Sequence, residues 1–154
     1  MKITLVAVGR MKEAHWREAA AEYLKRLGPY AAVEVVEVAD RDVTRDEARA
    51  LADEGSDVLR ALPDGAHVIA LEPGGRRMSS EQFADELGAH MLEGRSRVAF
   101  VIGGAAGFAP AVLARADDRL SLGPMTLPHQ LARVVLLEQV YRAFRILRGE
   151  PYHR

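Results

Sequence analysis

Five short apolar runs alternate with amphipathic segments along the chain, and this alternation constrains the fold more than any other feature. The runs are Ile3–Val8, Val33–Val38, His67–Leu71, Val98–Ile102 and Arg119–Leu122. Val98–Ile102 is entirely apolar, which is typical of a strand buried on both faces. Strands that alternate with helices usually pair in parallel, so we expect an α/β fold with a mostly parallel sheet flanked by helices.

The segments between these runs carry the signals of helices. Apolar residues recur at helical spacing through Ala14–Leu27, and a Gly-Pro pair then ends the pattern. Thr44 is placed to cap a helix that runs to Leu62. Further helices are expected from Ser79 or Ser80 to Met91, over 110–116 and over 128–147. Because no repeat, linker or low-complexity tract interrupts the alternation, we predict a single domain over residues 1–154.

The composition excludes several classes of chemistry. The chain has no cysteine, so it cannot form disulfides, thiolate metal sites or a thiol nucleophile. His15, His67 and His90 lack partners at metal-ligand spacing, and we therefore assign them structural roles and predict no metal. No run of about 18 apolar residues is present, and the first apolar run is too short for a signal sequence. We expect a cytoplasmic protein with no membrane partner.

Positive charge is concentrated near the C-terminus. The formal net charge of -1 gives no overall attraction for nucleic acid. From Ser121 to Arg154, however, five arginines stand against two acidic residues. Such arginines can bind phosphate groups, although a solvated helix face is their commoner role. The charge pattern leaves RNA binding open and confines it to this part of the chain.

Unusual loops follow three of the predicted strands, after Leu71, Ile102 and Leu122. Ligands of open α/β sheets bind beyond such carboxyl ends. Gly103–Gly107 lets a ligand approach the backbone, but it matches neither the dinucleotide-binding nor the P-loop pattern. Gly123–Pro128 contains two prolines and forms a stiff segment suited to a flat ring such as adenine. Both loops are equally compatible with plain connections that bind nothing.

The last helix and the tail behind it are also unusual. The helix over 128–147 is more apolar than one sheet contact requires, which indicates either a partner subunit or burial in its own core. The chain then ends with Tyr152, His153 and Arg154. These side chains could stack on a base and bind phosphate, whereas the simpler interpretation is a frayed terminus.

Four motifs occur together in a fixed order. They are Ile102-Gly103-Gly104-x-x-Gly107, Met125-Thr126-Leu127-Pro128-His129, Glu138-Gln139-x-Tyr141-Arg142-Ala143 and Pro151-Tyr152-His153-Arg154. With this combination the whole chain, from Leu5–Gly9 to its last residue, resembles the ribosomal large-subunit pseudouridine N3-methyltransferases, a minimal SPOUT family. Ala105-Ala106 stands where relatives often carry polar or acidic residues, so only backbone contacts are expected at these two positions.

The resemblance implies a C-terminal trefoil knot, a homodimer and S-adenosyl-L-methionine (AdoMet) as methyl donor. The cofactor-binding residues that it implies are Leu71, Gly103, Gly104, Leu122, Gly123, Pro124, Met125, Thr126 and Leu127. It implies that Arg142 and Tyr152 contact the substrate RNA. It implies catalytic roles for His129, His153 and Arg154, with both subunits contributing to a site.

The activity implied by the resemblance is methylation of N3 of a pseudouridine in a stem-loop of 23S ribosomal RNA, on assembled ribosomes. The imide nitrogen must lose its proton as it attacks the methyl group, and His129 or His153 could accept that proton. Arg154 would stabilise negative charge on the flanking carbonyls. The alternative is a non-catalytic, ribosome-associated module that binds AdoMet. A flavodoxin-like nucleotide binder is a weaker third reading, because a phosphate loop is missing.

Overall fold

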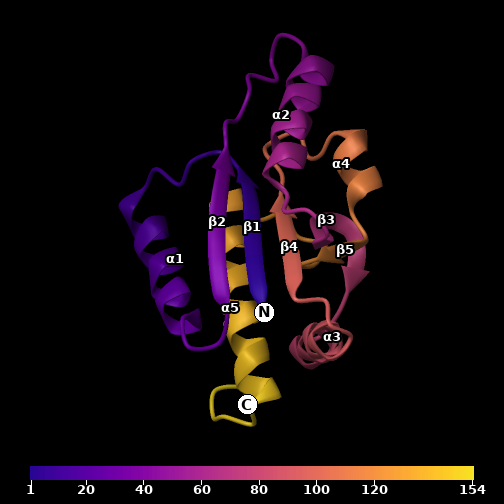
Figure 1. Cartoon of the computed structure of the whole chain (residues 1–154). Helices are drawn as coiled ribbons and strands as arrows, with labels where there is room; N and C mark the ends of the chain where they lie inside the picture. The colour runs from indigo at the N-terminus through magenta and orange to yellow at the C-terminus, as the bar shows by residue number, and fades with distance from the viewer.

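A computed structural model describes all 154 residues. Its five strands form one parallel sheet in the order β2-β1-β4-β3-β5, which confirms the expected mostly parallel arrangement (Figure 1). The strands are β1 (Lys2–Val8), β2 (Ala32–Val38), β3 (His67–Arg77), β4 (Arg97–Ile102) and β5 (Asp118–Ser121). The helices are α1 (Ala14–Leu27), α2 (Glu47–Ala61), α3 (Ser80–Leu92), α4 (Pro110–Arg115) and α5 (His129–Leu147).

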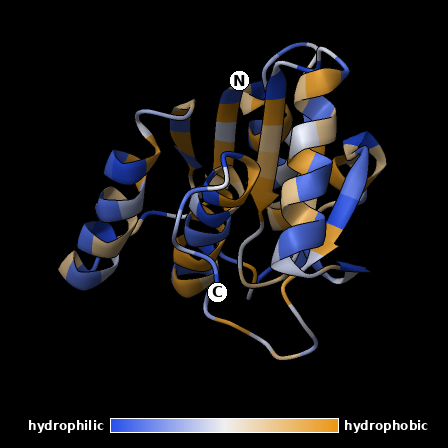
Figure 2. Cartoon of the chain, turned by 90° about the horizontal axis from the view of Figure 1, so that it is seen from below, coloured by the Kyte–Doolittle hydropathy of each residue, from blue (hydrophilic) through white to orange (hydrophobic).

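Two apolar cores lie on opposite faces of this sheet. Successive residues of a strand point to opposite faces, so Leu5 and Phe100 pack under α1, α3 and α5, whereas Val6 and Val101 pack under α2 and α4. Figure 2 shows the result, with apolar strands at the centre and the hydrophilic sides of the helices turned outward. None of the helices combines the length and the apolar character that crossing a membrane requires.

The start of α2 differs from the predicted one. Thr44 does not cap the helix, because both its hydroxyl and its backbone N–H donate to the Asp42 carboxylate, at 2.6 and 2.9 Å. Asp46 is the cap instead, and its side chain accepts a hydrogen bond from the Arg49 backbone N–H at 3.1 Å. Thr44 and Asp46 are both short polar residues of the kind that caps helices, and the prediction chose the one that lies two residues too early.

β3 is longer than its apolar run. Leu71 and Arg76 both pair with Leu120 of β5, and the chain between them bulges outward. At Gly75 the two backbones touch, since a Cβ atom there would lie 2.8 Å from the carbonyl carbon of Arg119. Residues 72–77 extend β3 beyond this run, pair only with the short edge strand β5 and have largely exposed side chains. The apolar pattern therefore ends at Leu71.

Candidate functional site

A cavity of about 850 Å³ lies at the carboxyl ends of β3, β4 and β5. It is walled by the three loops that the sequence singled out, and its volume falls in the range of small-molecule sites. The predicted cofactor residues that line it are Leu71, Gly103, Gly104, Leu122, Gly123, Met125, Thr126 and Leu127. Pro124 is exposed and is not part of the wall.

Other residues complete the wall without having been predicted. Phe108, Leu113 and Ala132 are apolar and come from α4, its preceding loop and α5. Nothing in the sequence distinguishes them from ordinary core residues. They line the cavity because α4 and α5 both begin beside the carboxyl edge of the sheet.

The glycine loop after β4 is closed by its own backbone. The Gly107 N–H donates to the Gly104 carbonyl at 3.1 Å, and Gly107 has a φ of 83° that disfavours a side chain. A Cβ atom on Gly103 would lie 2.9 Å from the Gly107 carbonyl oxygen. Glycine is therefore needed at both positions, and this wall offers a ligand backbone groups rather than side chains.

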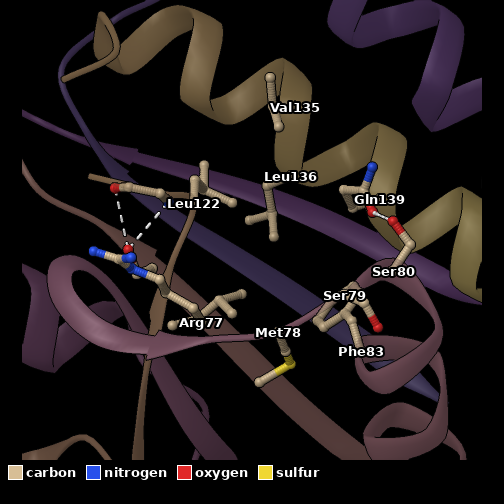
Figure 3. A pocket seen from close by; sticks show the side chains of 12 residues that line it. Arg77, Met78, Ser79, Ser80, Phe83, Leu122, Val135, Leu136 and Gln139 are labelled. Atoms are coloured by element: carbon tan, nitrogen blue, oxygen red, sulfur yellow. Dashed lines mark hydrogen bonds between the residues drawn. The ribbon is translucent and has the colours of Figure 1, made fainter. Parts of the chain in front are cut away.

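A smaller cavity of about 290 Å³ lies on the other side of the loop that follows β5, between α3 and α5 (Figure 3). There the Gly123 N–H donates to the Ser121 hydroxyl at 3.1 Å, and the Ser80 hydroxyl bonds the side chain of Gln139 at 2.6 Å. Leu122 and Gly123 line both cavities. The backbone at these two residues separates the cavities, and contacts on both sides hold its conformation.

The C-terminal tail is docked rather than frayed. The Tyr152 hydroxyl donates to Glu138 at 3.0 Å, and its ring packs edge-on against Tyr141. Arg142 bonds the same Glu138 and also lies 3.1 Å from His153 Nδ1. Burial of the Tyr152 phenol, together with its bond to Glu138, raises its pKa to about 12.

His129 and the tail lie at opposite ends of α5. His129 opens the helix and lines the large cavity, whereas His153 and Arg154 follow its C-terminal end, beyond the opposite edge of the sheet (Figure 1). The tail folds back so that His153 contacts Arg142, which lies 13 residues, about 20 Å at 1.5 Å per residue, from His129 along the helix. One chain therefore does not bring the three predicted catalytic residues together.

Most of the C-terminal arginines are already paired. Arg133 is 5% exposed and bonds Glu37 at 2.6 Å, Arg142 pairs with Glu138, and Arg145 pairs with Glu150, as their salt bridges show. The expected basic patch is thus largely neutralised within the chain. Arg148, which lies over the Tyr30 ring, and the exposed Arg154 remain without an acidic partner.

The remaining histidines lie away from the large cavity. His67 and His90 are in contact, with ring centroids 4.2 Å apart, and His67 Nε2 lies 3.0 Å from an Asp118 carboxylate oxygen. Burial, reinforced by the neighbouring His67 and Arg95 charges, lowers the pKa of His90. No group of three or more His, Asp or Glu side chains is arranged to hold a metal ion.

Comparison with known proteins agrees with this geometry. The family model described as predicted SPOUT methyltransferase matches residues 1–153. A ribosomal RNA large subunit methyltransferase H from Listeria monocytogenes serotype 4a (strain HCC23) is 53% identical over 100% of both chains. A protein of the same name from Carboxydothermus hydrogenoformans is 48% identical, also over the full length of both.

Solved structures show the same fold at low sequence identity. A probable methylase family protein from Haemophilus influenzae Rd KW20 aligns with a TM-score of 0.61 and 15% identity, covering 96% of this chain and 66% of the other. The SpoU methyltransferase AviRb from Streptomyces viridochromogenes, crystallised with AdoMet, aligns with a TM-score of 0.51 and 13% identity, covering 97% and 61%. With a family model spanning its length and full-length relatives near half identity, this chain belongs to the SPOUT methyltransferase family, among the ribosomal RNA large subunit methyltransferases H.

Proposed function

We propose that this protein transfers a methyl group from AdoMet to N3 of a pseudouridine in 23S ribosomal RNA, on assembled ribosomes in the cytoplasm. The observation that carries the proposal is the cavity at the carboxyl edge of the sheet, where residues implied by the family resemblance form one wall. The full-length relatives, which are named as large-subunit ribosomal RNA methyltransferases, support the RNA substrate.

The cavity fits AdoMet in both size and chemistry. Its wall combines apolar side chains such as Leu71 and Leu127 with backbone groups of Gly103 and Gly104, a mixture suited to a flat adenine ring with polar edges. A side chain at Gly103 would collide with the opposite strand of its loop, so the backbone itself must face the ligand. When bound, AdoMet supplies an electrophilic methyl group on a sulfonium centre.

His129 is the residue best placed to take part in the reaction. Its side chain is half-buried and lines the cavity at the start of α5. In the reaction the N3–H bond breaks, the nitrogen forms a bond to the methyl carbon, the carbon–sulfur bond breaks, and S-adenosylhomocysteine leaves. A neutral imidazole at His129 accepts the N3 proton, which a positioned base accelerates by on the order of 10²- to 10⁴-fold.

The tail enters the site from a second copy of the chain. Within one chain His153 docks on Arg142, which lies 13 residues, about 20 Å along α5, from His129, so we expect the tail to reach a cavity only from a partner subunit. A homodimer is further supported by half-buried apolar residues on α5, including Leu131, Val134 and Val135. In this arrangement the exposed Arg154 guanidinium stabilises negative charge on the base carbonyls.

We also propose that the chain is knotted, as the family resemblance implies. The path of the C-terminal segment supports this, because β5 pairs with β3 at the edge of the sheet, whereas α5, the next helix, packs between α1 and α3. A trefoil knot is an exception to the rule that chains do not thread their own loops.

The test is methyl transfer from radiolabelled AdoMet to ribosomes that lack the modification, followed by nucleoside analysis. The expected product is N3-methylpseudouridine in the large-subunit RNA. Binding of AdoMet with no transfer to ribosomes would contradict the enzyme and favour the non-catalytic, ribosome-associated module. A naked stem-loop should be a poorer substrate than the ribosome, because the chain carries few unpaired cations for RNA.

A further inference from the structure

A polar cavity of about 170 Å³ adjoins the large cavity. The two share Gly104, Ala105 and His129 as a common wall. The large cavity has mainly apolar walls, whereas the polar cavity is lined by residues after β1, the loop before α2, and the first turns of α5. A group held in the polar cavity would therefore lie next to the proposed base and to the loop that faces AdoMet.

Glu54 is the unusual residue of the polar cavity. It lies on α2, is only 5% exposed and lines the polar cavity. Oxygen Oε2 accepts a hydrogen bond from the Arg41 backbone N–H at 2.9 Å. Oxygen Oε1 has no hydrogen-bond partner in the chain, and neither oxygen forms a salt bridge.

The unpaired oxygen faces the shared wall. A Cβ atom built on Gly104 would lie 3.4 Å from Glu54 Oε1, so the carboxylate sits directly beneath the glycine loop. The guanidinium of Arg133, also 5% exposed and lining the polar cavity, is engaged with Glu37 and the Gly9 carbonyl instead. An acceptor oxygen that has no partner in the chain and opens onto a polar cavity is available to a hydrogen-bond donor of a ligand.

We propose that Glu54 selects pseudouridine over uridine by accepting a hydrogen bond from N1–H of the target base. This inference rests on the proposed function. In uridine N1 is bonded to the sugar, whereas in pseudouridine the sugar is bonded to C5 and N1 carries a hydrogen. N1–H is thus the one ring donor that the two bases do not share, and an ionised carboxylate can only accept.

Glu54 and His129 both line the polar cavity, and one pyrimidine ring of pseudouridine carries two N–H groups. N1 and N3 flank the same carbonyl carbon, so both donors project from one side of the base. His129 on the shared wall accepts the N3 proton, and Glu54 below Gly104 holds N1–H without taking its proton. Uridine in the same place offers Glu54 no N1–H donor, and a site built to hydrogen-bond an N–H group rejects an analogue that lacks it.

The experiment compares three otherwise identical ribosome substrates that carry pseudouridine, uridine or N1-methylpseudouridine at the target position. Wild-type protein should methylate pseudouridine and should act at least 100-fold more slowly on the other two, a loss of the size expected when a buried acceptor is left unpaired. Glu54→Gln keeps the size of the side chain, and its amide oxygen can still accept the hydrogen bond from the Arg41 backbone N–H. Its NH₂ group then faces N1–H, and two donors cannot form a hydrogen bond. Its kcat/KM for pseudouridine should fall by 100-fold or more while AdoMet affinity, measured by calorimetry, is unchanged.

The control is Asp53→Asn, an exposed acid of the same helix beside Glu54, which should leave turnover and base preference at wild-type values. If Glu54→Gln retains the wild-type preference for pseudouridine, the inference is wrong while the proposed function stands. If wild-type protein methylates no substrate at all, the proposed function fails and the inference with it. Should Glu54→Gln not fold, equal methylation of pseudouridine and N1-methylpseudouridine by the wild type would still overturn the inference.

Discussion

Subunit complementation tests the shared site most directly. His129→Ala removes the proposed base from the cavity, and Arg154→Ala removes the charge that the tail presents, so each homodimer should lose most of its activity. In one chain the tail docks on Arg142, about 20 Å along α5 from His129, so we expect the two positions to meet only across a dimer interface. A mixed dimer instead holds one site with both defects and one intact site.

The expected recovery follows from counting sites. If the two variants are unfolded and refolded together in equal amounts, about half of the dimers are mixed, and about a quarter of all sites are intact. Methyl transfer to unmodified ribosomes should therefore return to about a quarter of the wild-type rate. The control is the same pair of variants refolded separately and then assayed together. No recovery after joint refolding, with mixed dimers shown by differently tagged subunits, would refute the shared site.

Three further predictions follow from contacts of α5 and the tail. Arg133→Met should lower the free energy of unfolding by about 2–3 kcal/mol, because it removes a buried charged hydrogen bond to Glu37; an unchanged urea midpoint would contradict this. The Tyr152 pKa is raised in the folded state, so its contribution to stability should be complete below pH 10 and be lost between pH 10 and about 12, a loss that Tyr152→Phe should remove. RNA affinity should depend only weakly on salt, with a log–log slope of about -1 to -2, because Arg148 and Arg154 are the unpaired C-terminal cations; a slope steeper than about -4 would show that the internal pairs open on binding.

Because most of the C-terminal arginines are paired within the chain, few of them are available to bind RNA phosphates. By residue count the C-terminal segment has a positive charge balance, but Glu138 and Glu150 lie within reach of Arg142 and Arg145 once the helix and tail fold. Acidic residues from elsewhere add to this, as Glu81 does by bonding His153 at 2.6 Å. These contacts order the tail side chains, and a side chain held in place loses less entropy when it meets RNA.

The sheet, the helices and the three loops around the large cavity could be predicted from the order of residues alone. Alternation of apolar runs such as Val98–Ile102 with amphipathic segments is a local property, since it depends only on the period of side chains along a strand or a helix. Glycines at 103, 104 and 107 could likewise be interpreted without the fold, because their conformational freedom is intrinsic to the residue. The motif order around these loops was enough to identify the family.

Which of these residues meet depends on the folded arrangement of the whole chain. His129 and Arg154 belong to two separate family motifs, and α5 keeps them apart in one chain, a separation that no local sequence pattern reports. Glu54 gave no signal in the sequence, where it is one acid among several on an exposed-looking helix. Its burial and its free oxygen arise because α2 packs beneath a loop 50 residues away in the chain, and such long-range contacts depend on the whole fold rather than on the residues nearby.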